Sequence, residues 1–436
     1  ELMAQREAEQ EAISRNPVDD LDEAFEIILS ECTEEFIGFH PIDETFLAWM
    51  YTTFGEQIIE EIATAVKNEY EDTSIWYHLT GKTIQVLWSE FCRDSGFQSD
   101  RLEHVYWKTA ANENEIVMDF SGDVNFMDGL GNMRHLREKG EGIEGCFSED
   151  LLREMRSADI CMINNEFTYS TRGEPLSGKP FTFRADPSTV SFLDDLGVDI
   201  VGIANNHVYD FGPDALVDTV DTLDAAGVPH VGAGKNLDEA EEPVYFIMNG
   251  WKIGIVAATQ IERSLNYTKE ATEDTPGVLK TLDPDKFITV IGEAKHNADI
   301  VVAFVHWGTE GNSAYGTDQE ELAREFVNAG ADVIIGGHTH CLQGIAYVDD
   351  VPVIYSLGNY WFSSTQTDGQ KALETGLAQV RIDTEGRIRF RFLPCMQENW
   401  ETHLATGSEG ARILSYEDSL SSGVTIESDG YVKREK

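Results

Sequence analysis

Two histidines stand two residues apart in the GGHTH segment at residues 336–340, and this is the strongest sign of chemistry in the sequence. In extended backbone, His338 and His340 would point to one face, about 7 Å apart. The preceding Gly336 and Gly337 let the main chain approach neighbouring groups closely. Imidazoles placed in this way can serve two neighbouring metal ions or two sides of one cluster, although a lone His-x-His pair also occurs without metal. The segment therefore predicts a metal site.

Four further segments place ligand-type side chains directly after short apolar runs that we expect to be strands. They are residues 120–125, 163–167, 204–210 and 304–308. Open α/β sheets carry their binding sites at the carboxyl ends of strands, so these side chains are expected at one edge. Taken singly, each segment has an ordinary structural interpretation: a Gly-Asp turn, a paired glutamate or a satisfied core histidine. Their occurrence together favours a metal site.

The ligand types in these segments are imidazole, carboxylate and amide. The chain has 11 histidines and six cysteines, and no two cysteines form a C-x-x-C pair of the kind that holds structural zinc. Mixed nitrogen and oxygen ligands without thiolate suit one or two divalent ions of Mn, Fe or Zn. Two such ions about 3.5–4 Å apart activate a water and stabilise the displaced oxygens of phosphoryl transfer. Beside them, Asp210 would fix the tautomer of His207 and raise its basicity.

Helical patterns dominate residues 1–112, ahead of these segments. Apolar residues recur there at three- and four-residue spacing over residues 20–32, 55–66 and 82–91. The region shows no strand alternation and no cluster of ligand-type residues, so we predict a helical accessory domain. At the other end of the chain, we expect residues 401–436 to form a polar tail.

Short apolar runs alternate with helical stretches over residues 113–400. Runs rich in β-branched residues, such as residues 300–305, indicate buried strands. A capping box at Thr317–Glu320 is expected before an amphipathic helix that stops at Gly330. Later segments favour antiparallel hairpins, one of them with an Asn249-Gly250 turn of type I′. This order predicts an α/β (α+β) fold of two packed sheets with helices outside.

The composition narrows the classes of function. The 436 residues include 79 Asp+Glu against 32 Lys+Arg, a formal net charge of −47. This charge excludes binding of nucleic acid through a general basic surface, because phosphate binding needs Lys and Arg. It also argues against adsorption to anionic lipid. No apolar run approaches the roughly 20 residues of a membrane-spanning helix. Because the chain begins at Glu1 without Met, we expect that an N-terminal anchor or signal was removed, and that the membrane is reached only through that segment.

The order of the segments resembles one family. FSGDVNF, INNEF, GKPFTFRADP, ANNHVYDFG, HWGTE, GGHTHCLQG and YSLGNYWF follow one another between about residues 115 and 395. They are similar to the signatures of the CapA-type capsule synthesis family (poly-γ-glutamate capsule, PGA_cap) of the calcineurin-like metallophosphoesterase superfamily. The resemblance implies an α/β/β/α sandwich of two mixed sheets over residues 113–400. Residues 1–112, the helical domain that precedes it, lie outside the resemblance.

The resemblance also implies ligands for two metal ions. Asp123 and His340 would bind the first ion, with Asn125 where the wider superfamily has a histidine. Glu166 would be the bridging carboxylate, a position usually held by Asp, and its extra methylene changes the reach. The ligands of the second ion would be Asn206, His306 and His338.

The resemblance implies roles near the metal ions for four other residues. His207, paired with Asp210, would be the catalytic imidazole that protonates a leaving oxygen or stabilises the transition state. Arg184 would either clamp an anionic substrate or form a structural salt bridge. Asn359 would line the pocket or cap a strand.

The resemblance therefore implies a CapA-like protein of bacterial capsule, poly-γ-glutamate or other surface-polymer biosynthesis, with hydrolysis of phosphoester bonds as its expected reaction. The alternatives are a non-catalytic polymer-binding or scaffold component of the capsule machinery and a metal-dependent γ-glutamyl amide hydrolase. The expected partners are an anionic polymer or a small phosphorylated substrate, and the membrane proteins of capsule synthesis. The expected location is extracellular or at the cell surface. Since a chain of charge −47 repels polyglutamate at long range, a bound polyanion needs the metals and a local basic patch.

Overall fold

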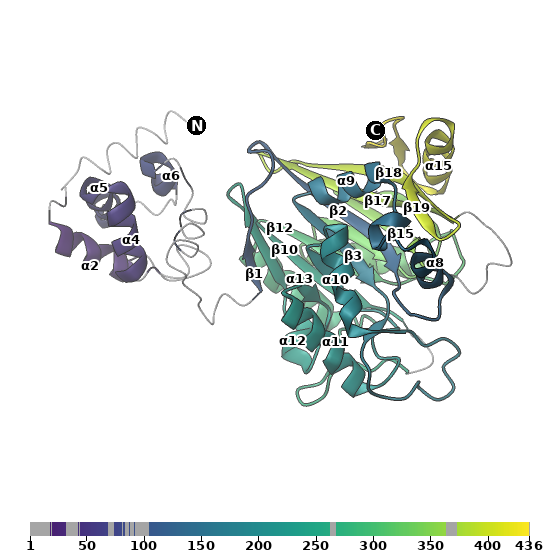
Figure 1. The fold of residues 1–436 in the computed structure, drawn as a ribbon. Coiled ribbons are helices and arrows are strands. Elements are labelled where there is room, and N and C mark those ends of the chain that lie inside the picture. The colour runs from purple at the N-terminus through teal and green to yellow at the C-terminus, as the bar shows by residue number, and fades with distance from the viewer. Residues whose placement is uncertain are drawn as a thin grey trace. The chain divides into compact units, whose positions relative to one another are not determined.

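The chain divides into two compact units. The structure, a computed structural model, describes residues 18, 20–31, 42, 44–68, 74–80, 82, 87, 91, 104–261, 267–362 and 373–435. One unit comprises Glu1–Trp107 with Phe246–Lys252, and the other comprises Lys108–Tyr245 with Ile253–Lys436. Figure 1 labels several helices and strands of each unit.

The described helices of the N-terminal unit pack around an apolar core. They are Leu21–Glu31 (α2), Glu44–Phe54 (α4), Glu56–Lys67 (α5) and Ser74–Thr80 (α6), followed by a short strand, Val105–Trp107 (β1). Phe46, Ile62 and Trp76 are among the side chains they bury. α2 and α5 agree within one residue with the helices predicted at residues 20–32 and 55–66. The helix predicted at residues 82–91 lies largely outside the described residues.

One mixed sheet of the second unit runs in the order β19-β18-β17-β2-β3-β6-β7. Its strands are Glu115–Val124 (β2), Ile160–Asn165 (β3), Ile200–Gly202 (β6), His230–Val231 (β7), Leu373–Asp383 (β17), Ile388–Glu398 (β18) and Glu401–Leu404 (β19). β2, β3, β6 and β7 are parallel, so their carboxyl ends lie at one edge, whereas β17 to β19 pair antiparallel. A short strand, Asn359–Trp361 (β16), also pairs with β2.

The other mixed sheet contains β9-β10-β12-β13-β15-β14 in this order. The strands are Val244–Met248 (β9), Trp251–Thr259 (β10), Ile300–His306 (β12), Val333–Gly337 (β13), Leu342–Val348 (β14) and Val351–Leu357 (β15). β10, β12, β13 and β15 are parallel, and β14 pairs antiparallel with β15. The predicted turn between β9 and β10 is confirmed, because Asn249 and Gly250 both have positive φ, 49° and 79°, as a type I′ turn requires.

The two sheets face each other, and helices cover their outer faces (Figure 1). β13 and β15 contact β2, and β15 also contacts β17. Four helices pack on the outer face of the sheet that contains β2: Gly131–Lys139 (α8), Glu149–Ser157 (α9), Ser191–Leu196 (α10) and Pro213–Ala226 (α11). Asp285–Asn297 (α13) and Thr317–Ala329 (α14) pack on the outer face of the other sheet. The predicted α/β/β/α sandwich of two mixed sheets is confirmed.

The remaining described elements before the C-terminal segment are short. They are Thr168–Tyr169 (β4), Arg184–Ala185 (β5), Ala233–Gly234 (β8), Gly277–Val278 (β11), Leu237–Glu241 (α12) and the 3-10 helices Ile143–Cys146 (η2) and Pro187–Val190 (η3). Among the helices that the structure describes, none has the length and hydrophobicity of a membrane-spanning segment.

The start of α14 differs in detail from the prediction. The expected capping box ran from Thr317 to Glu320, whereas the N-cap is Gly316, whose N–H donates to Gln319 Oε1 at 3.0 Å. Because glycine has no side chain, one half of the motif is present. The helix ends before Gly330, which has a φ of 119°, as predicted.

Residues 401–435 do not form the polar tail that was expected over residues 401–436. They fold into β19, a helix Gly407–Leu420 (α15) and a hairpin of Val424–Ile426 (β20) and Val432–Arg434 (β21). The expectation rested on polar composition, but a surface helix needs an apolar stripe on one side only and is polar on the other. Ile413 and Leu414 supply buried side chains of that stripe.

Candidate metal centre

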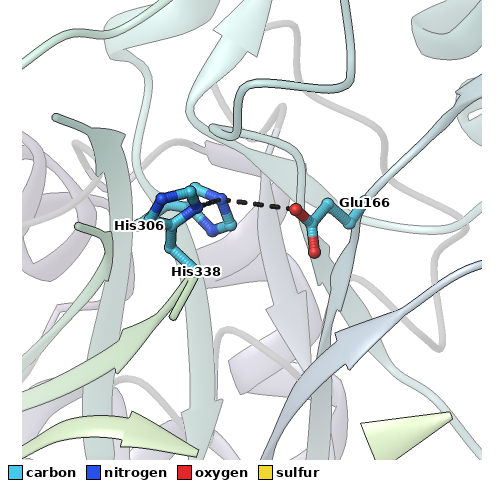
Figure 2. Close-up of side chains that lie close together, drawn as sticks. All are labelled: Glu166, His306 and His338. Atoms are coloured by element: carbon cyan, nitrogen blue, oxygen red, sulfur yellow. Dashed lines mark hydrogen bonds and ion pairs between the residues drawn. The ribbon is translucent and has the colours of Figure 1, made fainter. Parts of the chain in front are cut away.

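Strand ends from both sheets meet at the predicted site. Asp123 lies near the end of β2, Glu166 follows β3 directly, and His306 is the last residue of β12. His338 and His340 follow in the turn after β13. The parallel pairing of β2 with β3, and of β12 with β13, places each pair of carboxyl ends together. Figure 2 shows Glu166, His306 and His338 approaching one another from separate elements.

One group of candidate ligands comprises Glu166, His306 and His338, whose ligand atoms lie within 4.8 Å of one another. His306 Nε2 lies 3.1 Å from His338 Nδ1 and 3.6 Å from Glu166 Oε1. The same Nε2 lies 2.8 Å from Asn206 Oδ1. Burial lowers the pKa of both histidines well below the usual range, so they are neutral, the form that binds metal.

A second group comprises Asp123, Glu166 and His340, again with ligand atoms within 4.8 Å. His340 Nδ1 lies 3.0 Å from Asp123 Oδ2. Burial alone would lower the pKa of His340, but the carboxylates of Glu166 and Asp123 raise it to about 10. In this form His340 is an imidazolium, so a metal ion bound here must displace a proton.

Glu166 belongs to both groups. Its side chain has no exposed surface, and neither carboxylate oxygen has a hydrogen-bond partner in the described part of the chain. Burial, reinforced by Asp123, raises the pKa of Glu166 well above its usual range. A buried carboxylate is costly unless it is paired or coordinates a metal. The residues present therefore fit divalent cations that share Glu166.

Gly336 and Gly337 end β13, but the backbone is not extended at His338 and His340, so the expectation of extended backbone at the two histidines was wrong. His338 has a φ of 95° and His340 a φ of 57°. Non-glycine residues with positive φ are strained by about 1–3 kcal/mol each and concentrate at functional sites. The turn still directs both imidazoles into the centre, with ring centroids 6.1 Å apart.

Two glycines let main chains approach closely beside the centre. A Cβ on Gly336 would lie 2.1 Å from the Tyr355 carbonyl oxygen, and one on Gly122 would lie 1.9 Å from the Gly358 carbonyl oxygen. Both distances are far below van der Waals contact. The close approach predicted at Gly336 is therefore confirmed.

His207 and Asp210 form a pair next to the metal ligands. His207 Nδ1 donates to Asp210 Oδ2 at 2.7 Å, and His207 Nε2 lies 3.9 Å from Glu166 Oε1. The Phe183 ring packs on the imidazole, with centroids 4.3 Å apart. Burial lowers the pKa of His207, although Asp210 acts in the opposite direction.

Comparison with known proteins identifies the family. Residues 117–364 match the model of the family described as "Bacterial capsule synthesis protein PGA_cap". The chain belongs to this family. The resemblance drawn from the order of motifs is thereby confirmed, and the matched region contains every residue predicted for the site.

Two relatives are named for capsule or polymer synthesis. The chain is 33% identical over 231 residues to "PGA biosynthesis protein CapA" of Bacillus subtilis, covering 53% of this chain and 59% of that protein. It is 32% identical over 214 residues to "Capsule biosynthesis protein CapA" of Bacillus anthracis, covering 48% of this chain and 50% of that protein. The matches thus span between half and three fifths of the length of these relatives.

Asn125 lies beside the centre with its amide bound to main chain. In this member of the PGA_cap family, Asn125 Nδ2 donates to the Glu166 carbonyl at 2.9 Å, and Oδ1 accepts from the Met127 N–H at 2.9 Å. The first of these bonds joins the segments that follow β2 and β3. Asn125 therefore positions Glu166 through the backbone.

The two residues predicted near the substrate differ in their placement. Asn359 Oδ1 lies 2.8 Å from His340 Nδ1, so Asn359 adjoins the second ligand group. Arg184 Nη1 instead donates to the carbonyls of Arg172 and Gly173, and the guanidinium lies 4.1 Å from the centroid of the Phe211 ring. Its described contacts do not include the metal-ligand groups.

Two buried asparagines adjoin the centre, and the sequence interpretation assigned a role to neither. Asn164 Nδ2 donates to Asp123 Oδ1 at 2.7 Å and lies 3.2 Å from His306 Nδ1. Asn205 Nδ2 donates to Asn164 Oδ1 at 3.0 Å, and Asn205 Oδ1 accepts from the His207 N–H. The doubled asparagine in both INNEF and ANNHV was the signal available in the sequence.

Proposed function

We propose that this chain is a metal-dependent hydrolase of phosphoester bonds that acts in the synthesis of a bacterial capsule, poly-γ-glutamate or another surface polymer. The observation that carries the proposal is Glu166, which both ligand groups share and whose two oxygens have no hydrogen-bond partner among the described residues. A carboxylate placed in this way could bind two neighbouring divalent ions at once. The names of the relatives support the biological setting.

The strand ends would supply the ligands of two ions. The first ion would be held by Asp123, Glu166 and His340, and the second by Glu166, Asn206, His306 and His338. Imidazole nitrogens with carboxylate and amide oxygens suit Mn, Fe or Zn. When bound, these ions would activate a water and offset the charge on the displaced oxygens.

His207 would provide the proton for the leaving oxygen. Because Nδ1 donates to Asp210, Nε2 is the ring atom directed at the centre, near Glu166. Burial lowers the pKa of His207 and so favours the neutral imidazole, whose Nε2 would first have to take up a proton; the resulting imidazolium would give that proton up readily. Phe183 packs on the ring and limits its rotation.

We place this activity outside the cell or at its surface, with membrane proteins of capsule synthesis as partners. The substrate would be an anionic polymer or a small phosphorylated compound. The net charge of −47 disfavours long-range attraction of a polyanion. A short anionic group that reaches the metal ions is therefore the part of the substrate we expect to be bound.

Two other functions remain as candidates. A non-catalytic polymer-binding role is favoured by Asn125, whose amide is bound to main chain and leaves the first ion with three side-chain ligands. Hydrolysis of γ-glutamyl amide bonds is favoured by the centre itself, because a metal-activated water attacks carbonyl carbon as well as phosphorus.

Metal content and turnover, measured on the same samples, separate these functions. Elemental analysis of protein purified without chelator, and again after loading with Mn, Fe or Zn, should detect bound metal. Asp123→Asn and His338→Ala should lower metal content and abolish turnover of p-nitrophenyl phosphate and bis(p-nitrophenyl) phosphate. His230→Ala is the matched control, since His230 is buried and lies 3.1 Å from Asp224 outside the ligand groups.

Each outcome favours one function. Bound metal with turnover that both ligand variants abolish supports the phosphoesterase. Bound metal with hydrolysis of γ-glutamyl-p-nitroanilide alone supports the amide hydrolase, and bound metal without any turnover supports the polymer-binding role. Metal at background level after loading contradicts the metal centre.

A further inference from the structure

A buried lysine lies behind the His207–Asp210 pair. The Lys179 side chain is 3% exposed, and its Nζ lies 2.7 Å from Asp210 Oδ1. The same ammonium donates to the main-chain carbonyl of Asn206. Lysine is almost never fully buried unless it is paired. Lys179 therefore contacts both the proposed proton-donating pair and the segment that carries a proposed metal ligand.

The Asp210 carboxylate is held through both oxygens. Oδ2 accepts from His207 Nδ1 at 2.7 Å and from the Phe183 N–H at 2.6 Å, while Lys179 approaches Oδ1. The carboxylate has no exposed surface, so its charge needs a cation nearby. Lys179, 2.7 Å from Oδ1, supplies that positive charge.

Neighbouring residues fix the position of Lys179. The carbonyl of Gly178, the preceding residue, accepts from Tyr267 Oη at 2.8 Å. Thr268 Oγ1 donates to the Asn206 carbonyl, the acceptor that Lys179 also uses, at 2.8 Å. The ammonium is thus held between defined partners by a segment that is itself anchored.

We propose that Lys179 is a positioning residue for the reaction at this centre. By binding Asp210 Oδ1 and the Asn206 carbonyl, it would orient the carboxylate that holds His207 Nδ1, and so would keep His207 directed at the metal ligands. The catalytic consequence rests on the proposed function, whereas the orientation of His207 can be measured without it. Without Lys179, the buried carboxylate would lose its charge partner and would turn toward water or another donor.

Lys179→Met and Lys179→Gln test the inference, with Lys295→Met as the matched control. Lys295 Nζ also pairs with an aspartate, Asp332, at 2.8 Å, but outside the ligand groups. The first measurement is the NMR signal of the His207 Nδ1–H in full-length protein labelled with 15N-histidine, assigned by its loss in His207→Gln. The second is kcat and KM for bis(p-nitrophenyl) phosphate, with metal content determined on each sample.

We expect both Lys179 variants to lose or broaden the His207 signal. We also expect kcat to fall about 10- to 100-fold, with KM and metal content little changed. Lys295→Met should keep all three, and Lys179→Gln, which retains a hydrogen-bond donor, serves if Lys179→Met does not fold. An unchanged His207 signal in a folded Lys179 variant overturns the inference. If the wild-type protein has no turnover, the proposed function fails, but the NMR signal still decides the positioning.

Discussion

His306 Nε2 and His338 Nδ1 lie 3.1 Å apart in the interior, although the two histidines come from different elements. Burial lowers the pKa of both, so neither carries charge that would drive them apart. Glu166 Oε1 lies 3.6 Å from the same His306 nitrogen. Burial of these ring nitrogens together with a carboxylate is costly, and a bound cation would offset that cost.

Asn164 should control metal affinity although we do not expect it to be a ligand. Its side chain donates to Asp123 Oδ1 at 2.7 Å and contacts His306 Nδ1, so it touches one ligand from each group. Second-sphere partners of this kind typically change metal affinity or activity by about 10–100-fold. We expect Asn164→Ala to weaken metal binding by that factor, measured by titration with Mn or Zn after chelator treatment.

Asn165→Ala is the matched control for Asn164→Ala. Asn165 is the neighbouring buried amide, and its Nδ2 donates to the Phe167 carbonyl at 3.1 Å instead of to a ligand side chain. We expect Asn165→Ala to retain the metal affinity of the wild type. Equal losses in the two variants would show that any disturbance at the end of β3 weakens the site.

Gly336→Ala and Gly292→Ala should change stability in opposite directions. A Cβ on Gly336 would meet the Tyr355 carbonyl at 2.1 Å and would disturb the 2.8 Å hydrogen bond that Trp307 Nε1 donates to it. Overpacking of this kind costs about 1–3 kcal/mol. Gly292 lies within α13, and a Cβ there would lie 3.9 Å from the Ala329 carbonyl oxygen, so alanine should add about 0.5–1 kcal/mol. Urea unfolding measures both, and a Gly336→Ala variant as stable as wild type would contradict the close approach.

The secondary structure around the centre follows from local pattern, but the side-chain contacts do not. Strand-end positions of His306 and Glu166 could be inferred because the carboxyl ends of parallel strands meet at one edge. The positive φ values of His338 and His340 could not be inferred, since they depend on the packing of the turn after β13. A pattern of residue types predicts which side chains lie close together, but it does not predict the backbone conformation that places them there.

The sequence also did not predict which side chains support the centre without being ligands. Asn164 occupies an inward position on β3 that a core amide would share, so its contacts with Asp123 became visible only in three dimensions. Arg184 was expected to bind substrate or to form a salt bridge, yet it contacts main-chain carbonyls and the Phe211 ring. An arginine within a motif offers charge, and its tertiary neighbours determine whether that charge reaches a ligand.

Asp119 should make stability depend on pH. Burial raises the pKa of Asp119 from 3.8 to about 7, despite the hydrogen bond from Gln379. Between about pH 4 and pH 7 the folded protein therefore binds more protons than the unfolded chain, and the free energy of unfolding falls as pH rises, levelling off above about pH 7. The full effect is about 4 kcal/mol. The asparagine of the Asp119→Asn variant cannot ionise. The free energy of unfolding of the variant, measured by urea unfolding in chelator, should therefore increase relative to that of wild type as the pH rises across this range.

Asp186→Asn provides the contrasting case. Hydrogen bonds from Ser188 lower the pKa of Asp186 below 3.8, so its stabilising contribution is fully present above that pH and is lost only at more acidic pH. The difference between Asp186→Asn and wild type should therefore stay flat from pH 4 to pH 7. A flat difference for Asp119→Asn as well would contradict the raised pKa of Asp119.

Glu166→Gln should reverse its effect on stability when metal is added. In chelator, wild-type Glu166 is buried without a hydrogen bond to either oxygen from the described residues, and an unsatisfied buried polar group costs about 1–3 kcal/mol, more when charged. Glutamine cannot ionise and so avoids the cost that burial places on the carboxylate, and we therefore expect the metal-free variant to be at least as stable as wild type. With free Mn or Zn at 100 times its Kd, wild type should gain about 2.7 kcal/mol, whereas the variant, which lacks the shared carboxylate, should gain little.

Glu417→Gln separates metal binding from the general cost of a buried carboxylate. Glu417 in α15 also has no exposed surface, neither of its oxygens has a hydrogen-bond partner among the described residues, and burial raises its pKa well above the usual range. It lies outside both ligand groups, so Glu417→Gln should stabilise the protein equally with and without metal. Thermal unfolding of the two variants in chelator and in metal makes the comparison. If Glu166→Gln, like Glu417→Gln, changes the stability by the same amount in chelator and in metal, the burial of Glu166 is not coupled to metal binding.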